Sequence, residues 1–358
     1  MKQHIRLFTP GPIAVHPAVL RAAAQQPLYH RGQEFRQIME RVQRRLRMLF
    51  RTRSPVVVLT SSATGAHEAV AQMLHQPGTE AVVCINGRFS SRWAAMLQRL
   101  GVVVHRVESV WGENIALERL DAVLRQVSAI QSVWVVHCET STGVLVPLEQ
   151  IATIVRQHAP DAVLCADVVS SLGIDPFEMD GWGVDVAIAS SQKGVGGLPG
   201  LALVAIGSRA EERFRDQSPS LYFDLRLALD AARTHTTPFT PAVTLVAALD
   251  VALEQIEREE LPHRWTRYAR DATYLRRRLR TAGYQLFGQC TSHAVTPVII
   301  PPSVPGIVEV LQERYGFIVA RGQEHLRDRI IRIGHCGWYR RRDLVALADA
   351  LGEMISSL

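Results

Sequence analysis

Two lysines stand out in a sequence that otherwise carries its positive charge on arginine. Of the 40 basic residues, only Lys2 and Lys193 are lysines, and Lys193 lies mid-chain in Ser-Ser-Gln-Lys-Gly. A lysine amine can form a Schiff base with a carbonyl compound, especially when burial lowers its pKa, whereas an arginine cannot. A chance surface lysine would look the same in isolation, so the neighbouring sequence has to decide.

Asp167 ends an apolar run and precedes Lys193 by 193 − 167 = 26 residues, a spacing that fits one strand with its connections. A buried carboxylate is costly unless it has a cationic partner. Asp167 therefore either caps the segment that follows it or pairs with a protonated nitrogen of a ligand.

Hydroxyl-rich or aromatic segments follow three other apolar runs. Residues 60–68 place Ser and Thr across a turn that opens a helix, and residues 139–143 form a second hydroxyl-rich loop. Free N–H groups at a helix start bind phosphate, although an ordinary Ser or Thr cap explains the first segment equally well. Phe89, after the third run, is either a wall for an aromatic ligand or a core residue.

The elements that position these residues alternate between strands and helices. Strand candidates are residues 56–59, 81–85, 102–107, 132–137, 162–166, 185–189 and 201–206, with amphipathic segments at 66–75, 91–100 and 148–158 between them. This alternation predicts an α/β fold with a mostly parallel seven-stranded sheet flanked by helices. Ligands of such sheets bind beyond the carboxyl ends of the strands, where all the candidate residues lie.

The pattern changes after residue 206. Residues 207–240 read as irregular, residues 242–281 as a long helical stretch interrupted at Pro262, and 295–300, 317–320 and 330–333 as short strands before a helix at 341–355. We expect a smaller C-terminal α+β domain. The predicted division is an N-terminal arm at 1–20, a large domain at 21–245 that carries the candidate residues, and a small domain at 246–358.

Composition excludes several classes of protein. With 358 residues, 47% hydrophobic and 21% charged, the chain has the balance of a globular protein of about two domains. We find no apolar run near the ~18 residues of a membrane span, and no signal-peptide pattern. Five widely spaced cysteines without a C-x-x-C pair argue against disulfides and against a structural zinc site. We therefore expect a cytoplasmic protein with no metal and no membrane contact.

The basic balance raises the question of nucleic-acid binding. The net charge is +6, but the arginines are spread along the chain, and the densest cluster, at residues 276–280, reads as a solvated helix face. A basic stripe or a recognised motif would be needed to support a nucleic-acid interface. We expect none.

The candidate residues together fit one cofactor, pyridoxal phosphate. That cofactor needs a lysine for a Schiff base and an acid facing its pyridine nitrogen. It also needs an aromatic residue on its ring and a cup for its phosphate. Lys193 and Asp167, in this order on successive strand ends, supply the first two requirements.

Motifs spread over the chain make the resemblance specific. They are residues 9–12 (Thr-Pro-Gly-Pro), 64–69, 139–145, 167–173, 191–193 (Ser-Gln-Lys) and 332–334 (Arg-Ile-Gly). With them the sequence resembles class V, fold-type I, pyridoxal-phosphate aminotransferases. The similarity is greatest to the group that includes the alanine–glyoxylate, serine–glyoxylate and serine–pyruvate enzymes.

The resemblance implies a role for each matching residue. Lys193 would bind the cofactor aldehyde and move the α-proton, Asp167 would pair with the ring nitrogen, and Arg332 would clamp the substrate carboxylate beside Gly11. The other implied cofactor contacts are Ser62, Ala63, Thr64 and Gln192 at the phosphate, Phe89 and Val169 on the two ring faces, Thr140 or Ser141 near the ring hydroxyl, and Thr237 and Thr240 reaching the partner of a homodimer.

Three positions depart from the family pattern. The phosphate turn carries Ser-Ala where Gly-Ser-Gly turns are common, Thr237 stands where a tyrosine is often found, and the turn after Arg332 carries His335, Cys336 and Trp338. These departures leave the cofactor unchanged and put the substrate in question.

The resemblance implies transamination between a small amino acid, alanine or serine, and a small 2-oxoacid, glyoxylate or pyruvate. Two enzymes of the same fold remain as alternatives. One is a 2-aminoethylphosphonate–pyruvate transaminase. The other is a cysteine desulfurase or related lyase, which would need a mobile reactive cysteine, whereas Cys336 lies in a short turn. A cofactor-binding regulator would need an appended DNA-binding domain, and this sequence shows no such segment.

Overall fold

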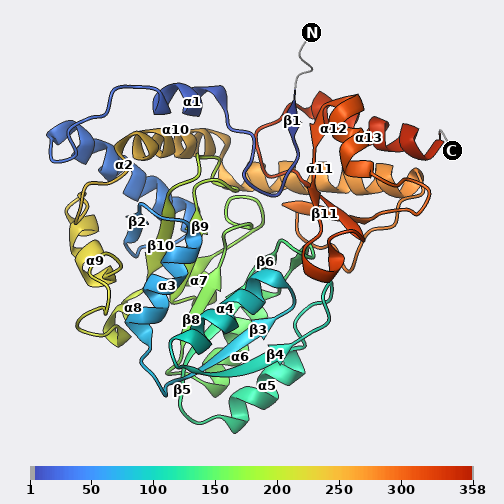
Figure 1. Cartoon of the computed structure of the whole chain (residues 1–358). Helices are drawn as coiled ribbons and strands as arrows, with labels where there is room; N and C mark the ends of the chain where they lie inside the picture. Colours follow the sequence, from blue (N-terminus) through green and yellow to red (C-terminus); the bar gives the residue numbers. More distant parts are fainter. Residues whose placement is uncertain (1–4, 357–358) are drawn as a thin grey trace.

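A computed structural model describes residues 5–356 and shows a large lobe beside a smaller C-terminal lobe (Figure 1). The large lobe is built on a seven-stranded sheet of order β2-β10-β9-β8-β5-β3-β4. Its strands are β2 Val56–Leu59, β3 Glu80–Ile85, β4 Val103–Glu108, β5 Ile130–Val136, β8 Val163–Asp167, β9 Val186–Ser190 and β10 Ala202–Ile206. Only β10 runs antiparallel to its neighbours, so the predicted mostly parallel sheet is confirmed.

The sheet separates two apolar cores because successive side chains of a strand point to opposite faces. Val56 and Val58 belong to one core, and Val57 and Leu59 to the other. The first core is covered by α2 Gln33–Phe50, α5 Leu117–Gln126, α6 Leu148–His158, α7 Met179–Trp182 and α10 Val243–Glu259. The second is covered by α3 Ala63–Leu74, α4 Arg88–Arg99, α8 Ser208–Arg213 and α9 Leu225–Arg233. Burial on both faces explains why these strands are continuous apolar runs.

The expectation that residues 207–240 are irregular is wrong, because α8 and α9 lie within them. Asp224 caps α9 by accepting hydrogen bonds from the backbone N–H groups of Arg226 and Leu227. The face that α9 buries is made of two leucines and two alanines at helical spacing, Leu225, Ala228, Leu229 and Ala232. This helical period is clear in the sequence, and it was missed because the prolines and polar residues around it led to one irregular reading of the whole stretch.

The long helical stretch breaks at Glu260, two residues before the expected Pro262. Glu260 adopts φ 64° and ends α10, and α11 Leu261–Thr281 begins at the next residue. Proline is tolerated in the first turn of a helix because its missing N–H has no intrahelical partner there. Pro262 therefore fits within the first turn of α11, and the break itself is made by the backbone of Glu260.

The small lobe is an α+β unit that also holds the N-terminal arm. Three strands, β11 Val295–Ile299, β14 Ile330–Gly334 and β13 Ala320–Arg321, form an antiparallel sheet. Strand β1 Arg6–Leu7, near the start of the chain, pairs in parallel with β12 Phe317–Ile318, and Figure 1 shows it in blue within the red lobe. The sequence predicted one strand at 317–320, which the structure divides into β12 and β13. The remaining elements are α1 Pro17–Ala23, β6 Cys138–Glu139, β7 Val144–Leu145, α12 Ile307–Tyr315, a 3-10 turn at Glu324–Leu326 and α13 Arg341–Ser356.

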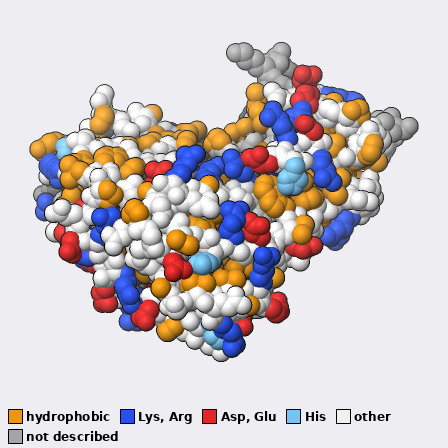
Figure 2. Space-filling model, turned by 60° about the horizontal axis from the view of Figure 1, so that its bottom comes forward, with side chains coloured by type: hydrophobic (Ala, Val, Ile, Leu, Met, Phe, Trp, Pro, Cys, Tyr) orange, Lys and Arg blue, Asp and Glu red, His pale blue; other side chains and the backbone are white. Residues whose placement is uncertain are grey.

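Three further expectations concern membrane contact, surface charge and the domain boundaries. Among residues 5–356, no helix has the length and apolarity required to cross a bilayer. Basic and acidic side chains are interspersed over the face seen in Figure 2. The domain division at residues 20 and 245 stays a prediction, and Lys2 lies outside the described residues.

Candidate active site

Lys193 and Asp167 lie at the same edge of the sheet, beyond the carboxyl ends of β9 and β8. The Lys193 amine donates a hydrogen bond of 2.7 Å to the carbonyl of Pro10 in the N-terminal arm. A Cβ atom on Gly11 would come within 2.4 Å of Lys193 Nζ, and Gly11 has φ 153°. Only glycine therefore allows the arm to approach the lysine this closely.

Burial and a nearby cation both act on the lysine. Burial lowers the pKa of Lys193, and the charge of Arg332 lowers it further, against opposing contributions from Cys336, Cys138 and Asp167. A lowered pKa increases the fraction of neutral amine, which is the nucleophilic form. The lysine is therefore prepared for covalent attachment to an aldehyde.

Three groups approach the Asp167 carboxylate. Oδ1 accepts a 2.9 Å hydrogen bond from the Val169 N–H. Oδ2 lies 3.3 Å from His67 Nε2 and 3.4 Å from Trp93 Nε1. Asp167 is only 6% exposed. A carboxylate held this way at a strand end suits a buried cationic partner such as a protonated ring nitrogen.

The start of α3 has the properties of a phosphate site. Ser62 is the N-cap of α3 but its hydroxyl does not cap the helix, so it is available to a ligand. Thr64 lies in the first turn, with Arg92 Nη1 3.5 Å from its hydroxyl. Nearby, Gln192 Oε1 is buried without a hydrogen-bond partner, and a rotated amide would present donors instead. Helix N–H groups, hydroxyls and an amide would bind an anion together.

A buried acid that the sequence reasoning missed fixes the opposite side of the site. Glu139 is fully buried and accepts hydrogen bonds from the N–H groups of Phe89 and Ser90 at the start of α4. Its Oε1 also accepts from the Ser141 hydroxyl at 2.6 Å. Glu139 thereby positions the backbone of Phe89, and it already accepts the hydroxyl hydrogen of Ser141. Of the two candidates near the ring hydroxyl, Thr140 is the one that is not bonded to the acid: its hydroxyl lies 2.6 Å from that of Ser170 and 3.5 Å from the Cys138 carbonyl.

Arg332 reaches the site from the small lobe, on β14. Its side chain donates to two carbonyls, of Arg321 at 2.9 Å and of Thr140 at 3.2 Å, and thus bridges the lobes. Among the described residues no acid forms an ion pair with it. Burial lowers its pKa to about 10, against an opposing effect of Glu139, so the guanidinium remains charged at neutral pH. A buried, charged arginine without an acid is suited to bind a carboxylate from a ligand.

A positively charged cavity lies beside the site, since Arg92 contacts Thr64 and the Arg321 carbonyl accepts from Arg332. This cavity, of about 330 Å³, is lined by Arg88, Arg92, Arg321, Arg327 and Glu324, together with Gly322 and Gln323. Arg88, from the large lobe, forms a 2.7 Å ion pair with Glu324 of the small lobe. Arginines thus outnumber acids in the lining of this cavity, and such a lining attracts anions.

Two predicted cofactor residues, Thr237 and Thr240, line a small cavity together with Thr60, the first residue of the candidate phosphate segment. Thr237 is buried, and its hydroxyl donates to the Phe239 carbonyl. Thr240 lies 3.4 Å from a nitrogen of His30 and is exposed. Within one subunit these threonines are not part of the cluster around Lys193.

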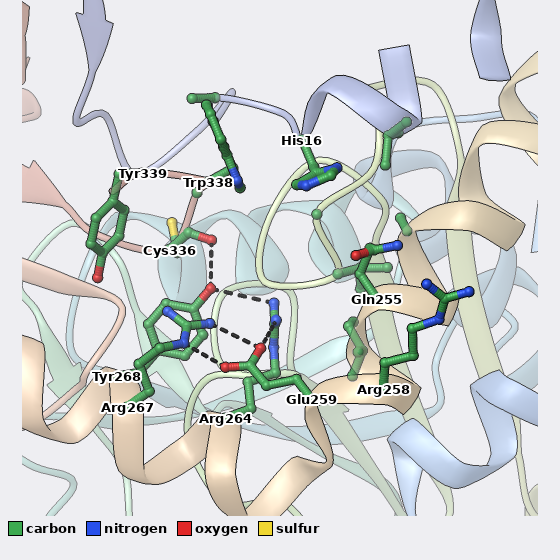
Figure 3. Close-up of a pocket in the computed structure, with 17 residues that line it drawn as sticks. His16, Gln255, Arg258, Glu259, Arg264, Arg267, Tyr268, Cys336, Trp338 and Tyr339 are labelled. Atoms are coloured by element: carbon green, nitrogen blue, oxygen red, sulfur yellow. Dashed lines mark hydrogen bonds and ion pairs between the residues drawn. The ribbon is translucent and has the colours of Figure 1, made fainter. Parts of the chain in front are cut away.

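A second cavity, of about 420 Å³, opens behind the Lys193 loop (Figure 3). Its arginines are already engaged: Arg264 pairs with Glu259 at 2.8 Å, and Arg267 pairs with the same carboxylate at 2.5 Å. Arg264 also donates to the carbonyls of Gly173 and Gly194, each at 2.8 Å. Arg264, which lines this cavity, therefore fixes the loop that follows Lys193 through its hydrogen bond to the Gly194 carbonyl.

A buried lysine amine and a buried aspartate at the carboxyl edge of this sheet define a pyridoxal-phosphate-dependent transferase of fold type I. A family model described as aminotransferase class-V matches residues 18–326, and the chain belongs to that family. Pyridoxal phosphate is accordingly its cofactor, and the residues around Lys193 fit that group.

Relatives that match nearly the whole chain carry two kinds of name, hydrogenase subunit and aminotransferase. The chain is 35% identical to the soluble hydrogenase small subunit of Synechococcus sp., over all of this chain and 94% of that protein. It is 31% identical to the serine–glyoxylate aminotransferase of Arabidopsis thaliana, covering 92% of this chain and 85% of the relative. The alanine–glyoxylate aminotransferase structure from Nostoc sp. superposes with a TM-score of 0.92 at 30% identity, covering 99% and 96% of the two chains.

The sequence reasoning also passed over His67 and Trp93 as partners of Asp167. Both lie inside helices, and His67 stands within the quoted motif at residues 64–69. A histidine on the inward face of a buried helix was the available signal. Its partner could be named only once the packing of α3 and α4 against β8 was known.

Proposed function

We propose that this chain transfers the amino group of a small amino acid, alanine or serine, to a small 2-oxoacid, glyoxylate or pyruvate. The observation that carries the proposal is the position of Arg332. It is a buried, acid-free guanidinium close enough to Lys193 for its charge to lower the pKa of that amine. Both donors and both acceptors carry a carboxylate beside the reacting carbon, which this guanidinium suits. The names of the serine–glyoxylate and alanine–glyoxylate relatives support the same substrates.

Each residue of the site then has a proposed task. Lys193 anchors the cofactor and moves the proton of the substrate Cα, and Asp167 pairs with the ring nitrogen. Arg332 orients the carboxylate, and Gly11 leaves room for it beside the lysine. The bound cofactor supplies a protonated ring that accepts the electrons released at Cα. The proposed cofactor contacts are Ser62, Ala63, Thr64 and Gln192 at the phosphate, Phe89 and Val169 on the ring faces, and Thr140 at the ring hydroxyl.

We further propose that the active form is a homodimer in which Thr237 and Thr240 approach the partner's phosphate. Apolar side chains are exposed on the same loop region: Tyr222 is 48% exposed and Phe239 38%, and their rings stack at 5.8 Å. Exposed apolar patches of this kind mark protein interfaces. Sizing of the cofactor-loaded protein tests this, because an active monomer would contradict a shared site.

The desulfurase alternative finds little support in the cysteines. All five are free and buried. Cys336 lies in a turn whose flanks are fixed, since Gly334 N–H donates to Phe8 and Trp338 N–H to Ala14. Burial raises the pKa of Cys336 and so disfavours its thiolate. Five free, buried thiols also support the expected cytoplasmic location.

Separate half-reactions in an Arg332→Lys variant test the substrate class. A lysine keeps the charge but loses the two-pronged hydrogen bonding of a guanidinium. For an amino acid donor and an oxoacid acceptor, both halves should slow, because both substrates carry the carboxylate. The donor half is followed by conversion of the cofactor to its pyridoxamine form, with a panel of amino acids.

The same measurement separates the aminophosphonate alternative, whose donor has no α-carboxylate. Damage confined to the acceptor half would favour that donor. Full activity in both halves would remove Arg332 from the substrate site and overturn the proposal.

A further inference from the structure

A histidine from α3 is directed at the acid that we propose for the ring nitrogen. His67 Nε2 lies 3.3 Å from Asp167 Oδ2, and the two side chains are 9% and 7% exposed. Nε2 is buried, and in this conformation no described residue forms a well-aligned hydrogen bond with it. A buried ring nitrogen without a hydrogen bond is costly, and the Asp167 carboxylate at 3.3 Å is the acceptor that a small rotation of either side chain would bring into line.

The orientation of His67 is fixed by packing. Its ring centre lies 3.6 Å from that of Trp93 on α4, and Trp93 in turn packs at 4.4 Å on Trp134 of β5. Trp93 Nε1 approaches the same carboxylate oxygen at 3.4 Å. Two donors on rigid helices therefore converge on Oδ2, while Oδ1 is held by the Val169 N–H.

The charge state of His67 decides what the contact does. Burial lowers its pKa, and Arg92 lowers it further, while Asp167 and Glu68 act in the opposite direction. The balance leaves a neutral ring, which donates from Nε2 without adding a positive charge. A cationic ring would instead compete with the pyridinium for the negative charge of Asp167.

We infer that His67 is a positioning residue, a neutral donor that holds Asp167 in place while leaving its full charge to the cofactor's ring nitrogen. This rests on the proposed pairing of Asp167 with that nitrogen. His67 itself touches neither substrate nor cofactor in this account. Its contribution is therefore specific to cofactors that have a ring nitrogen.

The test compares two cofactors on the same variants. One is pyridoxal phosphate, and the other is its 1-deaza analogue, in which C–H replaces the ring nitrogen. His67→Met removes the donor at similar volume and should weaken pyridoxal phosphate binding about tenfold, the size of one hydrogen bond to a charged group. Binding of the deaza analogue should change less than twofold. His67→Gln, which keeps an N–H donor, should restore most of the loss.

Two reference variants make the outcome decisive. His75→Met removes another buried histidine, at the end of the same helix, that bonds Thr79 and Ser132 rather than Asp167. It should affect both cofactors equally. Asp167→Asn should discriminate between the cofactors more strongly than His67→Met does.

An equal loss for both cofactors in His67→Met would overturn the inference and make His67 a packing residue. If Asp167→Asn also failed to discriminate, the assignment of Asp167 to the ring nitrogen would fall with it. Neither result depends on which amino donor the enzyme uses, because only cofactor binding is measured.

Discussion

Arg264 and Arg332 are equally buried, each 7% exposed, yet their surroundings differ. Arg264, in the cavity of Figure 3, pairs with Glu259 and donates to two backbone carbonyls and to Tyr268. Arg332 has two carbonyls and, among the described residues, no acid. An arginine whose donors and charge are all satisfied by the protein holds structure. One whose charge is left uncompensated is available to a ligand.

The largest effect should come from replacing Arg332 by Met, which removes the proposed carboxylate clamp. The kcat/KM of both half-reactions should fall at least about 100-fold, since truncating a desolvated charge pair costs about 2–5 kcal/mol. The free energy of unfolding should change by no more than about 1 kcal/mol, because burial of an uncompensated charge is relieved while two hydrogen bonds are lost. Stopped-flow kinetics and thermal melts measure the two quantities.

Arg264→Met should show the opposite pattern. It leaves the carbonyls of Gly173 and Gly194 without their donor and removes one of the two arginines that pair with Glu259, and it should cost about 3 kcal/mol of stability. Residual activity at low temperature should exceed that of Arg332→Met. Chemical denaturation gives the stability, and a stable but inactive Arg264→Met protein would contradict the distinction between the two arginines.

A third prediction concerns the charge that Arg332 places near Lys193. A positive neighbour disfavours the protonated amine, so Arg332→Gln should raise the pKa of Lys193. The pH midpoint for attachment of pyridoxal phosphate should then move to higher pH, because less neutral amine is present at a given pH. Absorbance of the attached cofactor against pH measures the midpoint. The control is Arg258→Gln, which replaces an exposed arginine that pairs with Glu254 and should leave the midpoint unchanged. A midpoint that does not rise in Arg332→Gln would show that the charge of Arg332 does not act on the amine.

The smallest effect is expected for Glu259→Gln, at most about 1 kcal/mol, because this carboxylate is partly exposed and its ion pairs are screened. The pKa of Glu259 is lowered by Arg267 and Arg264, against the opposing effect of burial. A lowered carboxyl pKa stabilises the fold above the ordinary value of 4.5, and this contribution is lost as pH falls through the folded value. The difference in Tm between wild type and Glu259→Gln should therefore disappear in acid.

The sheet was predictable because its strands are buried on both faces. Every residue of β8 and of β9 is buried, so each strand reads as a continuous apolar run in the sequence. The chemistry was predictable for a different reason, since only a lysine can form the Schiff base and the chain has one internal lysine. Residue type and strand order were sufficient at these positions.

Other parts of the site could not be read from spacing. The contact between His67 and Asp167, and the capping of α4 by Glu139, join segments distant in sequence through the packing of helices on the sheet. Glu139 was visible only as the first residue of a hydroxyl-rich loop. Helix α9 was readable from the helical spacing of Leu225, Ala228, Leu229 and Ala232, and it was missed because the surrounding segment is polar and contains Pro219 and Pro238.

The pairing of β1 with β12 has a consequence for the order in which the protein is made. Arg6 also donates to the Tyr315 carbonyl, 309 positions further along the chain, and Gly334 donates to Phe8. The arm that brings Pro10 to the lysine is thus secured by segments that leave the ribosome near the end of synthesis. Lys193 and the sheet beneath it are made long before. The nascent chain therefore carries a reactive amine whose binding site is completed only by its last-made strands.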